Sequence, residues 1–144
     1  MISIRKIQLP APGIESLQSE ARQEGYVYID TLVQEWASAK TRFDGPGETL
    51  CGCLDLGLLV GVGALSCDPF AGRPDMGRIR KVYLRPAWRN QGVGRTLVST
   101  LVDHARSHFS CVRLRAENDG AARLYERLGF APICNPDASH ILYF

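Results

Sequence analysis

A turn with two glycines lies between an apolar strand and an amphipathic helix, and it is the feature that most constrains how this chain can fold. The turn reads Arg89-Asn90-Gln91-Gly92-Val93-Gly94-Arg95. A strand, turn and helix in this order point free main-chain N–H groups and the positive end of a helix dipole toward an anion. Gly92 and Gly94 have no Cβ atom that would keep a diphosphate away, and Arg89 and Arg95 add charged donors. Taken alone, the turn indicates either a phosphate site or a well-capped helix.

Hydrophobic periodicity on both sides of this turn predicts a chain of mixed strands and helices. Asn118 or Asp119 can cap the last predicted helix, and Gly129 can end it. The order of elements indicates an α/β or α+β class. The expected strands are residues 3–9, 48–55, 58–66, 78–84, 111–116, 130–134 and 140–144, and the expected helices are residues 14–21, 29–37, 93–109 and 121–128.

The length of 144 residues fits a single domain that spans residues 1–144. The N-terminus does not resemble a secretory leader, and no apolar run reaches the roughly 18 residues of a membrane span. We therefore expect a cytoplasmic protein without a membrane partner.

Charge is distributed unevenly along the chain. Residues 76–102 contain six basic residues and no acidic one, whereas the rest holds 11 of the 17 Lys and Arg against all 15 Asp and Glu. A basic centre in an acidic body favours an anionic ligand in the middle and a cationic second substrate. Tyr83 and Trp88 are the only aromatic residues in the basic run, so a nucleic-acid partner is not expected.

The five cysteines are an odd number spread through apolar stretches, which is typical of buried thiols rather than of a disulfide framework. Cys51 and Cys53 form a close pair, but no second Cys or His pair follows at ligand spacing. His104 and His108 lie four residues apart without the Glu of a zincin motif. We therefore expect no metal site.

Two motifs in this sequence resemble the signatures of the GNAT superfamily of N-acetyltransferases. Arg89-x-x-Gly92-x-Gly94 resembles the first signature, and residues 118–130, which begin with Asn118 and contain Tyr125, are similar to the second. The resemblance is close over residues 78–133 and limited to element order elsewhere. It implies a central mixed, mostly antiparallel twisted sheet of six to seven strands flanked by about four helices.

The resemblance also implies an acetyl-coenzyme A site. In the family, the sheet opens beside the strand equivalent to residues 78–84, and the pantetheine arm lies in the gap. Backbone groups of Val82 and Leu84 would bind this arm, and amides of residues 90–95 would bind the diphosphate. The implied cofactor-binding residues are Val82, Tyr83, Leu84, Arg89, Asn90, Gln91, Gly92, Val93, Gly94, Arg95, Asn118 and Tyr125.

Tyr125 matches the family tyrosine that protonates the departing thiolate, and a phenol with a reference pKa of about 10 is protonated at pH 7. Neither carboxylate that family members use as a base is present, because those positions are Arg78 and Ala116 here. Strand alternation is expected to turn Glu117 away from the face that position 116 occupies. The remaining candidates for the base are Glu48, Asp75, His140 and an ordered water.

The predicted reaction is transfer of the acetyl group to a primary amine by direct attack in a ternary complex, since no Cys or Ser occupies a matched position. The amine can belong to a small molecule or a peptide. The acceptor residues are expected within 14–40, 43–48 and the last two strands. The alternative is a non-catalytic acyl-coenzyme A sensor. Dimers are common in the superfamily, so a homodimer is an expected assembly.

Overall fold

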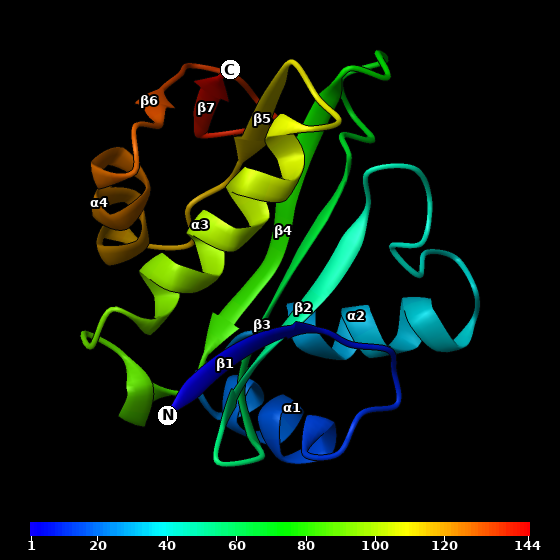
Figure 1. Ribbon diagram of the computed structural model, residues 1–144, viewed down its shortest axis with the longest axis vertical. Coiled ribbons are helices and arrows are strands. Elements are labelled where there is room, and N and C mark those ends of the chain that lie inside the picture. Colours follow the sequence, from blue (N-terminus) through cyan, green and yellow to red (C-terminus); the bar gives the residue numbers. More distant parts are fainter.

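The computed structural model describes residues 1–144, and its seven strands form one mixed sheet in the order β1-β2-β3-β4-β5-β7-β6. All neighbouring pairs are antiparallel except β4 and β5, which are parallel. Helix α3 lies across one face of the sheet, and α1 and α2 cover the other (Figure 1). The elements are β1 (Ile2–Lys6), α1 (Ile14–Gln23), α2 (Tyr28–Ala37), β2 (Thr49–Asp55), β3 (Leu58–Cys67), β4 (Met76–Leu84), a 3-10 turn (Pro86–Trp88), α3 (Val93–Arg106), β5 (Cys111–Leu114), α4 (Asp119–Arg127), β6 (Ala131–Pro132) and β7 (His140–Tyr143).

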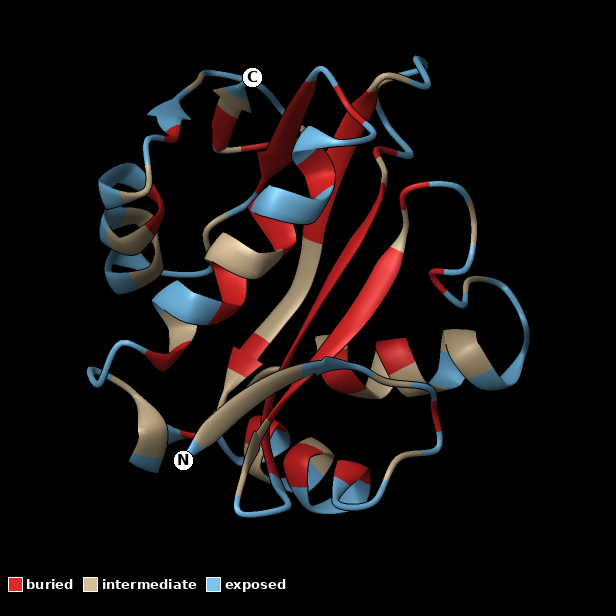
Figure 2. Ribbon diagram, viewed as in Figure 1, coloured by how far each residue is buried: buried red, intermediate tan, exposed pale blue.

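The two faces of the sheet carry separate apolar cores. Under α3, every apolar position at helical spacing is buried, as the sequence predicts. The opposite core joins α1 and α2 to β3 and contains Leu17, Ile29 and Leu32, none of which is exposed. Figure 2 shows buried residues along the central strands and exposed residues on the outer sides of the helices. This burial holds the central strand β4 firmly between two layers.

The sheet opens beside β4. The pairing of β5 with β4 covers Met76, Gly77 and Arg78, after which β4 continues to Leu84 without a strand on that side. On its other side, the pairing of β4 with β3 shifts register by one residue, and Lys81 has a positive φ of 59°. Such a bulge turns the following residues to the opposite face and increases the local twist. Residues 79–84 therefore present an unpaired strand edge to the rest of the molecule.

Helix α4 begins and ends as predicted. The Asn118 side chain accepts a hydrogen bond of 2.9 Å from the amide of Ala121, and Gly129 follows the helix with a φ of 101°. Burial of Tyr125 in the core under α3 fixes the face that α4 turns inward. The helix thus places its one buried residue beside the open part of the sheet.

The sequence-based fold class is confirmed, with corrections at strand ends. β5 ends at Leu114, not at Ala116, because the amide of Ala116 donates to the Ser139 hydroxyl at 2.8 Å instead of joining the ladder. The strand expected at 130–134 is only the pair Ala131–Pro132, since the ring nitrogen of Pro132 has no proton to donate. None of the four α-helices combines the length and apolar character needed to cross a bilayer.

Candidate active site

A cleft follows the unpaired edge of β4 and consists of two adjacent cavities of about 590 and about 200 Å³. We call the larger cavity the α3 end and the smaller one the β5 end. Four residues line both cavities, namely Tyr28, Val82, Glu117 and Tyr125. The α3 end is also lined by residues of the glycine turn and of α4, and the β5 end by residues 78–81, Phe70 and Arg115. The four shared residues therefore mark the junction at the middle of the cleft.

Free main-chain donors define the α3 end. Gly92, with a φ of 83°, precedes α3, and no side chain caps this helix. The amides of Val93, Gly94 and Arg95 donate to no other group of the protein. A Cβ atom at Gly94 would lie 3.6 Å from the Leu124 side chain, inside the cavity lining. This end thus offers unpaired N–H groups and a helix dipole to an anion.

The arginines of the turn differ in their surroundings. Arg89 donates two hydrogen bonds of 2.8 and 2.6 Å to the Glu24 carboxylate and a third, of 2.9 Å, to the Leu84 carbonyl. These bonds from Arg89 hold the pKa of Glu24 below its usual range. Arg95 is exposed in the lining and has no carboxylate within 4.0 Å. Arg89 therefore fixes the turn against the C-terminal end of α1, whereas Arg95 and Arg127 of α4 line this end without a carboxylate partner.

The carbonyl groups on the β4 edge already accept hydrogen bonds. The Tyr28 hydroxyl donates to the Val82 carbonyl at 2.8 Å, and Leu84 accepts from Arg89. A carbonyl oxygen has two lone pairs, so a ligand can still bind beside either donor. The ring of Tyr83 points to the α1 and α2 core, where its hydroxyl donates to Glu24 at 2.6 Å. Tyr28 thus anchors α2 to the middle of the cleft.

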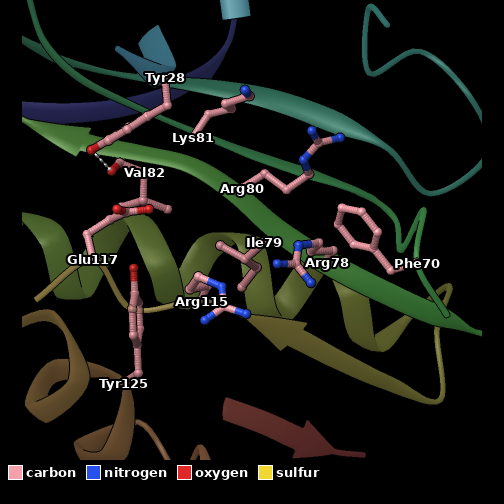
Figure 3. Close-up of a pocket in the computed structure, with 10 residues that line it drawn as sticks. All are labelled: Tyr28, Phe70, Arg78, Ile79, Arg80, Lys81, Val82, Arg115, Glu117 and Tyr125. Atoms are coloured by element: carbon pink, nitrogen blue, oxygen red, sulfur yellow. Dashed lines mark hydrogen bonds between the residues drawn. The ribbon is translucent and has the colours of Figure 1, made fainter. Parts of the chain in front are cut away.

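The junction brings a phenol and a carboxylate together. Figure 3 shows the Tyr125 hydroxyl pointing toward Glu117, whose carboxylate lies beside Val82. Tyr125 is 5% exposed, and burial, with a smaller effect of the Glu117 charge, raises its pKa to about 12. Its hydroxyl has no hydrogen-bond partner within the protein. The junction can therefore hold a proton on Tyr125 and accept one on Glu117.

Comparison with known proteins agrees with this geometry. The family model described as Acetyltransferase (GNAT) family matches residues 11–130, which is most of the chain. The chain belongs to the GNAT acetyltransferase family. Membership supports a transferase role for this protein.

Two curated relatives of this GNAT chain match over short segments. The N-alpha-acetyltransferase RimI of Mycobacterium tuberculosis is 35% identical over 52 residues, which cover 36% of this chain and 33% of that protein. The L-methionine sulfoximine/L-methionine sulfone acetyltransferase of Salmonella typhimurium is 38% identical over 52 residues, covering 34% and 30%. The matched segments thus span about a third of the relatives' length.

Solved structures reproduce the GNAT fold over the whole chain. A proposed acetyltransferase from Exiguobacterium sp. 255-15 has a TM-score of 0.90 at 21% identity and covers 99% of this chain and 93% of that one. A proposed acetyltransferase from Salmonella typhimurium, YncA, was solved with acetyl-CoA and has a TM-score of 0.71 at 19% identity, covering 99% and 91%. At these identities the likeness establishes the fold.

Most residues that the GNAT signatures predict for the cofactor do line the cleft. The exceptions are Gln91, whose side chain donates to the Ala87 carbonyl at 3.0 Å, and Val93, the first residue of α3, whose side chain is buried in the core. Each of these two residues can contact a ligand in the cleft only through its main chain. The predicted residues in the lining are Val82, Tyr83, Leu84, Arg89, Asn90, Gly92, Gly94, Arg95, Asn118 and Tyr125.

The sequence-based prediction that Glu117 faces away from the cleft is wrong. It assumed that strand alternation continues to residue 117, but β5 ends at Leu114 and the following segment turns into the cleft. An early loss of strand pairing leaves little signal in a single sequence. Tyr28 was also missed, because its position on an amphipathic helix suggests an ordinary core residue.

The three side chains predicted as candidate bases lie outside the cleft lining. The Glu48 carboxylate accepts from the amides of Gly45 and Cys67. Asp75 pairs with Arg73, which lowers the pKa of its carboxyl to about 2. His140 is buried and bonded to Glu126 at 2.8 Å. Each of these three side chains makes its contacts elsewhere in the fold.

Proposed function

We propose that this protein transfers the acetyl group of acetyl-CoA to a primary amine by direct attack in a ternary complex. The observation that carries the proposal is the junction of the two cavities, where Tyr125 and Glu117 lie together between a site for an anion and a second, smaller site. One ligand can enter from each side and meet the other at these two groups.

The α3 end fits the diphosphate and pantetheine of acetyl-CoA. Unpaired amides of residues 93–95 and the exposed Arg95 supply donors for the diphosphate. The open edge of β4 offers Val82 to an extended ligand in the manner of an added strand. When bound, acetyl-CoA supplies a thioester, whose carbonyl carbon an amine can attack. The structural relative solved with acetyl-CoA supports this choice of cofactor.

Tyr125 can act as the general acid. With a pKa of about 12, its hydroxyl stays protonated at neutral pH and can donate to a sulfur anion as that anion leaves. Its hydroxyl points into the cleft toward Glu117 but makes no hydrogen bond within the protein, so no internal bond has to break first. A packing role alone would not require the hydroxyl to face the cleft.

Glu117 can act as the general base, directly or through one water. An alkylamine with a reference pKa near 10.4 costs about 4.6 kcal/mol to deprotonate at pH 7, so a nearby carboxylate is needed more than for an α-amino group near 8. Glu117 is the only carboxylate in the cleft lining. The name of one relative, an N-alpha-acetyltransferase, supports nitrogen as the attacked atom.

The composition of the lining supports direct attack. None of the five cysteines and no serine lines either cavity, so no thiol or alcohol is placed to hold the acetyl group. The acceptor amine is the remaining nucleophile. Initial rates should therefore fit a sequential rather than a ping-pong scheme.

The experiment is thiol release from acetyl-CoA over a panel of amines, combined with calorimetry of acetyl-CoA binding. We expect both binding and amine-dependent thiol release. Glu117→Gln should lower kcat about 100-fold at pH 7 while acetyl-CoA affinity stays within twofold, and Glu15→Gln, an exposed change on α1, should alter neither. Binding without release for any amine would replace the proposal with an acyl-CoA sensor, and no binding at millimolar acetyl-CoA would refute both.

A further inference from the structure

Basic side chains dominate the β5 end of the cleft. Of the ten residues that line this cavity of about 200 Å³, four are basic, and Glu117 is the single acidic one. They come from β4 and from the segment after β5, so the fold gathers charges that are distant in sequence. The basic residues are Arg78, Arg80, Lys81 and Arg115.

Two of these cations are already paired. Arg78 lies 3.4 Å from the Asp68 carboxylate and donates to the Asp137 carbonyl at 2.6 Å. Asp68 is shared, because Arg113 donates to the same oxygen at 2.9 Å. Lys81 lies 3.5 Å from the Glu35 carboxylate. One carboxylate thus compensates Arg78 and Arg113 together, which leaves positive charge in excess.

The other two cations, Arg80 and Arg115, have no carboxylate within 4.0 Å. Arg115 donates to the Pro136 carbonyl at 2.5 Å, which fixes its guanidinium and leaves further N–H groups free. Arg80 lies over the Phe43 ring at 6.0 Å and donates no hydrogen bond within the protein. Both arginines therefore have donors available for a ligand.

Burial strengthens the positive field at this end. Arg78 is 8% exposed, and the side chain of Lys81 is 9% exposed. Burial, followed by the charge of Arg80, lowers the pKa of Lys81. Charges near a low-dielectric wall interact more strongly than charges in water. Binding in this cavity is therefore electrostatically favourable for an anion and unfavourable for a polycation.

We infer that the acceptor is a small amine that also carries an anionic group, in the simplest case the carboxylate of an amino acid. Arg115 would hold the carboxylate, and the amine would lie at Glu117, next to Tyr125. Arg80, whose guanidinium points away from Arg115 in Figure 3, would add to the positive field of the cavity. Arg115 stands two residues before Glu117, so both groups of a short molecule can be reached from one segment. The inference rests on the proposed function and reverses the expectation of a cationic acceptor drawn from the charge of the whole chain.

The test compares the standard amino acids other than proline, aspartate and glutamate with their carboxamides, which keep the primary amine and remove the negative charge. Spermidine is added as a polycation. Thiol release from acetyl-CoA is the readout. We expect kcat/KM for at least one acid to exceed that of its amide about tenfold or more, and spermidine to be poor. Amides or spermidine used as well as the acids would overturn the inference and leave the acetyltransferase intact. No release with any amine would overturn both.

Variants separate recognition from folding. Arg115→Gln and the double change Arg80→Gln with Arg115→Gln should raise KM for the acid, with kcat within about twofold, and leave the rate with the amide unchanged. Arg5→Gln, an exposed change on β1 outside the cleft, is the matched control. Equal losses with acid and amide would show that these arginines only maintain the structure, and would overturn the assignment.

Discussion

The two ends of the cleft are built in different ways. The α3 end relies on consecutive residues and on main-chain N–H groups that face the cavity whichever side chains surround them. The β5 end relies on side-chain charges from the 68–70 loop, from β4 and from residues 115–117. A ligand common to a whole family suits the first arrangement, because the backbone does not change with sequence. The second arrangement can vary from one protein to the next, which suits the choice of acceptor.

The largest predicted effect tests how tightly the β5 end is built. Asp68→Asn leaves Arg78 and Arg113 buried without a counter-charge, and we expect a loss of about 3–5 kcal/mol in the free energy of unfolding. Urea denaturation at pH 7 measures it. Asp103→Asn removes an exposed pair at 3.9 Å and should cost under about 0.5 kcal/mol.

The pH dependence of the same carboxylate provides a second check. Burial opposes ionisation of Asp68, but hydrogen bonds from Arg113 and the Phe70 amide keep its pKa below the ordinary value. A carboxyl with a lowered pKa contributes stability above its unfolded pKa near 3.9 and loses it as pH falls through the folded value. The gap in stability between wild type and Asp68→Asn should therefore narrow on acidification below about pH 4. If Asp68→Asn lowered the free energy of unfolding by less than about 1 kcal/mol at pH 7, solvent would have to reach Arg78 and Arg113. The β5 end would then not depend on buried charges.

The next effect lies at the junction. Tyr125→Phe removes the acid while keeping the ring in the core under α3, so we expect kcat to fall about 100-fold or more. The Kd for acetyl-CoA, measured by calorimetry, should stay within about twofold. Because the pKa of Tyr125 is about 12, the wild-type rate should show no loss from this group below about pH 11. Equal losses in turnover and affinity would show that Tyr125 only shapes the cavity.

The smallest effect tests the main-chain character of the α3 end. Gly92 and Gly57 have φ values of 83° and 85°, and a Cβ atom at either would meet nothing within 4 Å. Alanine at each position should therefore cost a similar amount of stability, about 1–2 kcal/mol, from the left-handed backbone alone. Only Gly92→Ala should weaken acetyl-CoA binding, by about fivefold, because only this turn presents amides to the ligand. Weaker acetyl-CoA binding in both variants would indicate a global effect on the structure. It would contradict the view that main-chain amides define the α3 end.

Sequence reasoning succeeded where the signal was local. The Asn118 cap, the stop at Gly129 and the buried face of α3 all follow from spacing within one element, and the structure has each of them. It failed at Glu117, because the end of β5 depends on a hydrogen bond from the Ala116 amide to Ser139, a residue 23 positions away. No residue near position 116 in the sequence indicates that Ser139 is its partner.

The fold family and the glycine turn could be predicted from the sequence alone, since glycines, helix periodicity and main-chain donors act over a few consecutive residues. Contacts between distant segments, in contrast, set which carboxylate lines the cleft and which sign of charge surrounds the smaller cavity. Net charge sums over the whole surface, whereas a substrate meets only the groups within a few ångströms. Two features set those groups here. The short pairing of β4 with β5 opens the cleft, and the sharing of Asp68 between two arginines leaves excess positive charge.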